Sequence, residues 1–431
     1  MNTKGIITVI VTIAIGVILT TGVLVPVIQD VSNSGTQTSV KSVSASPLVV
    51  WLTTDDGKLF GTGDNESGQQ GIDTGGEAIT EFTQRLTGEN VKEVVANGST
   101  TWVITTDGKL FGTGYNSTGQ QGSGTTDNVT EFTQRLANES VKEVISTSDT
   151  TWAITDDGKL FGCGTNPSGQ QGSGDTTDVT TFTQRLTGEN VKEVVVSSGV
   201  TWVITTDGKL FGTGFNSYGQ QGSGDTTDVT TFTQRLTGEN VNEVATAYGE
   251  TVWAITTDGK LFGCGRNNSG QQGSGDTTNV LTFTQRLTGE NVKDVVTTGY
   301  TTWVITDDGN LFGCGKNGSG QQGSGTTDNV TEFTQRLTGE NVKEVAANSD
   351  YTTWVITTDG KLFGTGDNYY GQQGIDTDGE PITEFTLHDF SDSESSGNGV
   401  SPTILTMLSV IPLIVIVGLI VATVGYFMRR E

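Results

Sequence analysis

Residues 91–136 read VKEVVANGSTTWVITTDGKLFGTGYNSTGQQGSGTTDNVTEFTQRL, and close copies of this stretch fill most of the chain. Tryptophan occurs seven times, with successive spacings of 51, 50, 50, 51, 50 and 51 residues, at Trp51, Trp102, Trp152, Trp202, Trp253, Trp303 and Trp354. A fixed period of this length is typical of propellers and solenoids. The segment Val40-Lys41-Ser42-Val43 stands as far before Trp51 as Val91 stands before Trp102, so we count seven complete repeats.

The pattern inside each repeat is that of short β-strands. TWVIT and KLFGTG flank Asp107-Gly108, and an Asp-Gly pair occupies this place in all seven repeats. Asp-Gly between two β-rich runs favours a tight hairpin with a type I′ turn, in which both residues have positive φ. VKEVV and FTQRL supply two further strands. Four strands in each of seven repeats predict an all-β fold, a seven-bladed β-propeller of four-stranded blades.

A linear β-solenoid is the alternative architecture. Solenoids usually have shorter repeats and need capping units at both ends. Here the first and last repeats resemble the middle ones, as a closed ring permits.

Two apolar segments flank the repeats. Residues 6–28 and 404–427 carry no charge and are long enough to cross a hydrocarbon core of roughly 30 Å as helices. Lys4 precedes the first segment and Arg429 and Arg430 follow the second, so we expect both termini in the cytoplasm and the repeats outside the cell. A cleaved signal peptide is the alternative interpretation of the first segment.

These features predict six parts. They are a transmembrane helix or signal-anchor at 1–30, a linker at 31–39, the propeller at 40–390, a flexible linker at 391–403, a second transmembrane helix at 404–428 and a cytoplasmic tail at 429–431.

Composition limits the chemistry that the chain can perform. The net charge of −26 disfavours nucleic acid as a partner. His388 is the single histidine, which leaves little material for a histidine base or a histidine metal cluster. Cys163, Cys264 and Cys314 stand where the other repeats have Thr, which suggests small, half-buried side chains. Acidic pairs such as Asp175 and Asp178 offer too few oxygens for calcium. We therefore expect no catalytic residues, no metal and no cofactor.

The repeats resemble those of the regulator of chromosome condensation family. Residues 114–122 (GYNSTGQQG) and 214–222 (GFNSYGQQG) match the family's G-x-N-x-x-G-Q-x-G loop, and equivalents occur in every repeat, over residues 40 to about 389. The resemblance implies a seven-bladed propeller. The founding member is a nuclear exchange factor that binds a small GTPase and chromatin, whereas some secreted members bind and inhibit other proteins.

This chain departs from the family pattern in two places. Thr100 and Thr101 stand before Trp102 where the family usually has His, and Gln replaces the loop's Leu in all seven repeats, from Gln70 to Gln373. With the negative charge and the predicted membrane segments, these departures suggest that the fold is shared with the founding member and the partner is not.

Two stretches vary between repeats while the rest is nearly constant. They are the residues just before each Trp and those after each Gly-x-Gly, and hairpin geometry places both at the end opposite the Asp-Gly turns; we call this end the variable rim. Tyr and Arg are enriched at binding hot spots. The candidate binding residues are Tyr115, Phe215, Tyr218, Tyr248, Arg266, Tyr300, Lys316, Tyr351, Tyr369 and Tyr370. The alternative is that these side chains only pack against neighbouring loops.

Other repeated residues are predicted to serve the scaffold. We expect the seven Trp side chains in the core and the Gln-Gln amides bonded to the backbone of the neighbouring blade. Eight Asn-x-Ser/Thr sequences could carry glycans on an exported chain: Asn65, Asn97, Asn116, Asn128, Asn138, Asn267, Asn317 and Asn329.

The sequence favours a cell-surface binding or display module, anchored in the lipid bilayer by two helices, whose variable rim engages protein or carbohydrate. An extracellular polysaccharide lyase or hydrolase is one alternative, but an active site needs unlike groups that converge on one point, and the repeats are nearly interchangeable. A structural surface coat is the other alternative.

Overall fold

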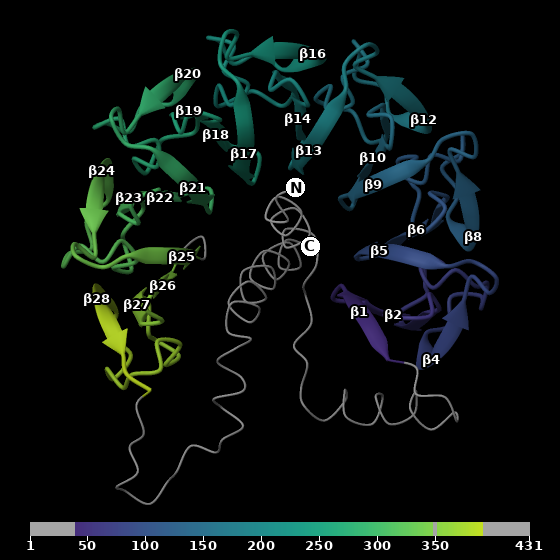
Figure 1. The fold of residues 1–431 in the computed structure, drawn as a ribbon, viewed down its shortest axis with the longest axis horizontal. Coiled ribbons are helices and arrows are strands. Elements are labelled where there is room, and N and C mark those ends of the chain that lie inside the picture. Colours follow the sequence, from purple (N-terminus) through teal and green to yellow (C-terminus); the bar gives the residue numbers. More distant parts are fainter. Residues whose placement is uncertain (1–38, 348–350, 391–431) are drawn as a thin grey trace, which may run out of the picture. The chain divides into compact units, whose positions relative to one another are not determined.

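The computed structural model describes residues 39–347 and 351–390, and this part of the chain is all-β. Its strands form seven four-stranded antiparallel sheets, and in each sheet the strands lie in the order of the sequence (Figure 1). The strands belong to two compact units, one ending at Val196 and the other beginning at Ser197. The described residues contain no helix that could span a membrane. The apolar segments 6–28 and 404–427 lie outside the described residues.

The first strands of the seven sheets correspond to the VKEVV segments. They are β1 (Val40–Ala45), β5 (Val91–Asn97), β9 (Val141–Ser146), β13 (Val191–Ser197), β17 (Val241–Ala247), β21 (Val292–Thr297) and β25 (Val342–Ala347). The second strands carry the tryptophans. They are β2 (Val49–Thr54), β6 (Thr100–Thr105), β10 (Thr150–Thr155), β14 (Val200–Thr205), β18 (Thr251–Thr256), β22 (Thr301–Thr306) and β26 (Thr352–Thr357).

The third strands correspond to the LFG-x-G segments. They are β3 (Leu59–Gly63), β7 (Leu110–Gly114), β11 (Leu160–Gly164), β15 (Leu210–Gly214), β19 (Leu261–Gly265), β23 (Leu311–Gly315) and β27 (Leu362–Gly366). The fourth strands end each repeat. They are β4 (Ile79–Arg85), β8 (Val129–Arg135), β12 (Val179–Arg185), β16 (Val229–Arg235), β20 (Val280–Arg286), β24 (Val330–Arg336) and β28 (Ile382–His388). The four strands predicted for each repeat are thus confirmed, including β1 of the first.

The turn between the second and third strands differs from the prediction. In the second sheet the amide of Gly108 donates to the carbonyl of Thr105 at 3.0 Å, and the amide of Thr105 donates to the carbonyl of Lys109 at 3.0 Å. Gly108 has a φ of 82°, but Asp107 has no positive φ. This is a three-residue loop with a type I turn followed by a left-handed glycine, so the predicted type I′ turn is wrong. The Asp107 carboxylate instead accepts a hydrogen bond from the Thr105 hydroxyl.

In the six repeats that contain FTQRL, the fourth strand ends one residue earlier than expected. The Leu of FTQRL adopts a left-handed backbone, with a φ of 48° at Leu136, and its carbonyl accepts the amide of Glu139 at 2.9 Å. Such a backbone costs an L-residue about 1–2 kcal/mol. The side chain of Leu136 packs against the core formed by Trp102, Ile104 and Val141, which offsets this cost.

The tryptophans build the core between consecutive sheets. Trp102 pairs with Gly112 on the neighbouring strand, and a Cβ at Gly112 would lie 2.4 Å from the indole ring. The other side of the ring meets the edge of Phe182 in the next sheet, with centroids 5.6 Å apart. Six tryptophans are fully buried, as predicted, whereas Trp354 is half-buried and lies against His388.

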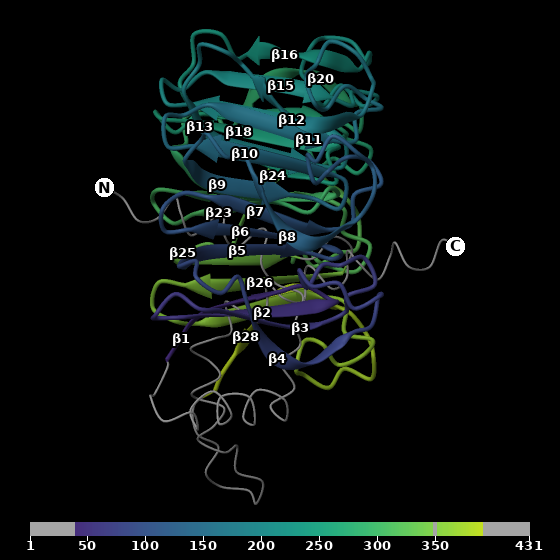
Figure 2. The ribbon, with the colours of Figure 1, turned by 90° about the vertical axis from the view of Figure 1, so that its right-hand side faces the viewer.

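Consecutive sheets pack face to face and are joined by backbone hydrogen bonds. In the first unit β5 packs against β2 and β9 packs against β6 (Figure 2). The amide of Val141, at the start of the third sheet, donates to the carbonyl of Gly108 in the second sheet at 2.8 Å. The turn glycine therefore both closes its own hairpin and fixes the start of the next sheet.

Candidate binding surface

Backbone hydrogen bonds bring the two variable stretches together. The residue after each Gly-x-Gly donates its amide to the carbonyl of the residue before the second strand: Arg266 to Glu250 at 2.8 Å, Lys316 to Tyr300 at 2.9 Å and Asp367 to Tyr351 at 2.7 Å. Each sheet therefore presents a fixed pair of variable side chains at the end opposite the Asp-Gly turn, where the sequence places the variable rim.

In the second unit, members of these pairs and Tyr218, which lies in the loop after β15, form a series of alternating tyrosines and cations across the sheets. The Arg266 guanidinium lies 5.2 Å from the ring centroid of Tyr218 and 4.8 Å from that of Tyr300. The Lys316 ammonium lies 5.5 Å from the ring of Tyr300 and 6.0 Å from that of Tyr351. We call these five residues the tyrosine–cation row. Each contact is a cation–π interaction of about 0.5–2 kcal/mol, depending on its exposure.

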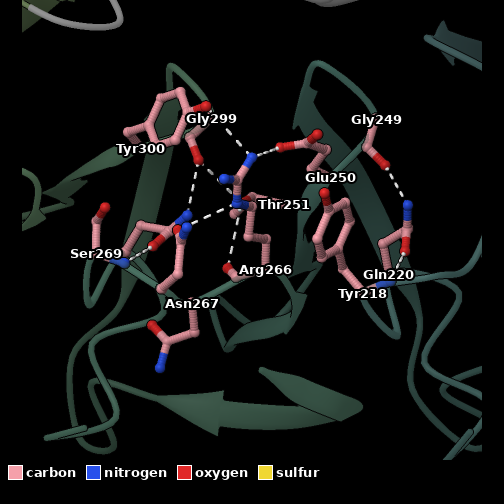
Figure 3. Close-up of polar contacts among 12 residues, drawn as sticks. Tyr218, Gln220, Gly249, Glu250, Thr251, Arg266, Asn267, Ser269, Gly299 and Tyr300 are labelled. Atoms are coloured by element: carbon pink, nitrogen blue, oxygen red, sulfur yellow. Dashed lines mark hydrogen bonds and ion pairs between the residues drawn. The ribbon is translucent and has the colours of Figure 1, made fainter. Parts of the chain in front are cut away.

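Arg266 is fixed at the centre of Figure 3 by several partners. It forms an ion pair with Glu250, and it donates to the Tyr300 hydroxyl at 3.3 Å and to the Asn268 side-chain oxygen at 3.1 Å. Burial alone would lower the pKa of Arg266, but the hydrogen bond and charge of Glu250 raise it overall. The guanidinium therefore stays charged and orients the tyrosine rings on both sides.

Glu250 was not among the candidate binding residues predicted from the sequence. It precedes Trp253 at the repeat position where the next repeat carries Tyr300, and the hydrogen-bonded pairing of this position with Arg266 is the signal that could have identified it. An acid among 49 acidic residues does not stand out by composition.

The glutamines that recur in every repeat connect this surface to the scaffold. The Gln220 side chain accepts the amide of Tyr218 at 2.9 Å and donates to the carbonyl of Gly249 in the next sheet at 2.9 Å (Figure 3). The first Gln of the pair thus ties its loop to the backbone of the next sheet at Gln120, Gln220 and Gln271, as predicted, whereas Gln69 and Gln372 donate to Asp64 and Asp367 of their own loops. The second Gln differs, because Gln121 donates to Thr113 of its own sheet at 2.7 Å.

The remaining candidate residues of the variable rim have different surroundings. Phe215 contacts Tyr218 edge-on, and Tyr369 contacts Tyr370 in the same way with centroids 4.8 Å apart. Tyr248 lies in the turn before β18 with a φ of 52°, and its ring lies against Gly299. Tyr115 belongs to the first unit and is 38% exposed.

The cysteines are more deeply buried than predicted. Cys163, Cys264 and Cys314 are fully buried, and the Cys163 thiol donates to the carbonyl of Gln120 in the preceding sheet at 3.3 Å. The threonine at the same position, Thr113, reaches the carbonyl of Gly68 at 2.7 Å. Burial raises the pKa of all three thiols, so they are unreactive donors that link sheets.

The paired aspartates accept hydrogen bonds from residues of their own loops. The Asp175 carboxylate accepts hydrogen bonds from Ser173 at 2.9 Å and from the amide of Thr177 at 3.1 Å, and Asp178 accepts the amide of Asn166 at 2.8 Å. Residues 39–347 and 351–390 contain no group of three or more His, Cys, Asp or Glu arranged to hold a metal ion.

Four of the eight glycosylation sequences are inaccessible in the folded structure. Asn65, Asn116, Asn267 and Asn317 are buried, and the Asn116 amide donates to Ser123, Thr125 and Asp127 while its oxygen accepts the amide of Gln121. Asn97 is half-buried. The exposed acceptors are Asn128, Asn138 and Asn329.

Away from the variable rim, the first unit contains a row of partly buried carboxylates on first strands. Burial raises the pKa of Glu93 and Glu193, and it raises that of Glu143 from 4.5 to about 7. The neighbouring carboxylates Glu93 and Glu193 add to this rise, whereas Lys142 and Lys92 oppose it. Glu143 is therefore partly neutral near pH 7.

Comparisons with known proteins agree with this geometry. Residues 342–372 match the regulator of chromosome condensation (RCC1) repeat. The structure is similar to that of human WBSCR16, with a TM-score of 0.52 and 23% identity over 73% of this chain and 86% of that one. It is also similar to Prp20p from Saccharomyces cerevisiae, with a TM-score of 0.51 and 15% identity over 82% of this chain and 87% of that one. The fold is therefore that of an RCC1-like β-propeller, in which each four-stranded sheet corresponds to one blade.

Proposed function

We propose that the chain is a non-catalytic protein-binding module, and that the tyrosine–cation row is the centre of its binding surface. The observation that carries this proposal is the alternation of Tyr218, Arg266, Tyr300, Lys316 and Tyr351 along one end of four consecutive sheets. Tyr and Arg dominate interface hot spots because they bury large, amphipathic surfaces.

Residues of the tyrosine–cation row are held in place by contacts within the chain itself. Arg266 is held by Glu250 and Asn268, and the backbone of Tyr218 is held by Gln220. A surface that is already ordered loses less side-chain entropy on association, so more of the contact energy becomes affinity.

A protein partner is consistent with solved structures of this fold. Yeast RCC1 (Prp20), which is similar to this chain with a TM-score of 0.50 and 14% identity over 82% of this chain and 90% of that one, is bound to Kap60 in one of them. That similarity concerns the fold alone, so the support for a binding role in this chain comes from its own row.

We further propose that the module is displayed outside the cell, tethered by the apolar segments 6–28 and 404–427. Their length and lack of charge, and the positions of Lys4, Arg429 and Arg430, support this topology. Protease digestion of intact cells tests it, because an external module is cleaved while a cytoplasmic one is protected.

The test of function is to probe the full chain against parallel arrays of proteins and glycans. A second preparation carries Tyr300→Ala and Tyr351→Ala. We expect protein signals that fall at least about tenfold with the double variant. Binding to glycans alone, or binding that the double variant leaves unchanged, would contradict the proposal.

A further inference from the structure

Tyr370 has the same place in its repeat as Tyr218, since each precedes a Gly-Gln-Gln sequence. The two tyrosines also make similar hydrogen bonds and ring contacts. In each case the Tyr amide donates to the following Gln side chain, at 2.9 Å for Tyr218 and 2.8 Å for Tyr370, and the ring meets a second aromatic ring edge-on.

Their surroundings differ in one respect. The Tyr218 ring is covered by Arg266 from the next sheet, whereas the Tyr370 ring is 86% exposed and contacts no cation within residues 39–347 and 351–390. Tyr370 thus has the position and geometry of a covered ring but lacks its cation.

Acidic residues flank this ring pair in the sequence. Residues 367–380 contain Asp367, Asp376, Asp378 and Glu380 and no basic residue. The turn that carries the last three lies beside Tyr369, because a Cβ at Gly379 would be 3.8 Å from the Tyr369 ring. Asp376, Asp378 and Glu380 are exposed. The local charge therefore attracts cations, in contrast to the tyrosine–cation row, where the chain supplies its own.

We propose that Tyr369 and Tyr370, with the acidic turn 376–380, bind an arginine or lysine side chain of a partner polypeptide. The cation lies over the Tyr370 ring as Arg266 lies over Tyr218, and the carboxylates of the acidic turn complement its charge. This inference rests on the proposed function and specifies the chemistry that the partner presents at the edge of the binding surface.

The test uses a short fluorescent peptide that contains two arginines, and a matched peptide in which citrulline replaces both. Citrulline keeps the shape of arginine but removes the charge. Binding to the full chain is measured by fluorescence anisotropy. We expect the citrulline peptide to bind at least about fivefold more weakly, a factor within the range of one cation–π contact plus screened charges.

Variants locate the site. Tyr370→Leu retains apolar area but removes the π-face, so it should weaken the arginine peptide about fivefold, and Tyr370→Phe should restore binding. Phe390→Leu is the control and should leave the peptide affinity unchanged, because this exposed aromatic residue follows His388, which pairs with Leu362 beside the Asp-Gly turn at the end opposite the variable rim. Asp378→Asn, which tolerates the left-handed backbone at this position (φ 54°), should weaken binding and reduce its salt dependence.

Equal binding of the arginine and citrulline peptides, or full affinity in Tyr370→Leu, overturns the inference. If either result occurs while the protein-array signals still depend on Tyr300 and Tyr351, only the cation site fails and the proposed function stands.

Discussion

Replacing Glu143 by Gln tests how a buried carboxylate on a first strand affects stability. The pKa of this carboxyl is about 7 in the folded chain and 4.5 as its ordinary value. Between these values the folded state binds a proton that the unfolded state has released, so the stability falls as pH rises from about 4.5 to 7. A pKa difference of this size corresponds to about 3 kcal/mol, and partial contact with water reduces the expected loss to about 2 kcal/mol.

The neutral amide of Gln removes this loss without changing the size of the side chain. We expect Glu143→Gln to gain about 2 kcal/mol over the wild type between pH 5 and pH 8, seen as a relative rise in Tm of about 2–8 °C. Thermal unfolding at several pH values measures the difference. Glu131→Gln, at an exposed residue of β8, corrects for the loss of one negative charge. A Tm difference between Glu143→Gln and wild type that is the same at pH 5 and pH 8 would refute the reasoning.

Three further predictions concern the scaffold. Gly112→Ala should cost more than about 2 kcal/mol, because its methyl group would lie 2.4 Å from Trp102, whereas Gly318→Ala, with open space around it, should be nearly neutral; thermal unfolding compares the two. The three cysteines should resist alkylation in the native chain and react after denaturation, which mass spectrometry detects, and modification of the native chain would contradict their burial. Where the exported protein carries N-linked glycans, peptide mapping should find them at Asn128, Asn138 or Asn329, and a glycan at Asn116 would contradict the buried amide.

The strand content could be predicted because each repeat restates the same local signals. Seven copies of the Trp strand, the Asp-Gly turn and the LFG strand make an accidental pattern improbable, and the structure confirms the four strands of each sheet. The turn type was wrong because Asp-Gly alone does not distinguish a two-residue loop from a three-residue one. Thr105, two residues before Asp107, selects the longer loop through its hydroxyl.

The binding surface could be predicted only in part. Variation between repeats identified Tyr218, Arg266, Tyr300, Lys316 and Tyr351, and hairpin pairing placed them at one end. The sequence could not show that the cations lie on the tyrosine rings, because those contacts join different sheets. It also did not separate Tyr248 from the rest, since its ring packs against Gly299 rather than joining the row.

Photocrosslinking tests most directly whether the tyrosine–cation row is where the partner binds. A photoreactive phenylalanine analogue replaces Tyr351 in one full-length preparation and Lys260, beside an Asp-Gly turn, in another. Both positions are in the second unit and both are accessible to solvent. We expect a partner identified on the protein array to be captured from position 351 and not from position 260. Capture from position 260 alone would contradict this expectation.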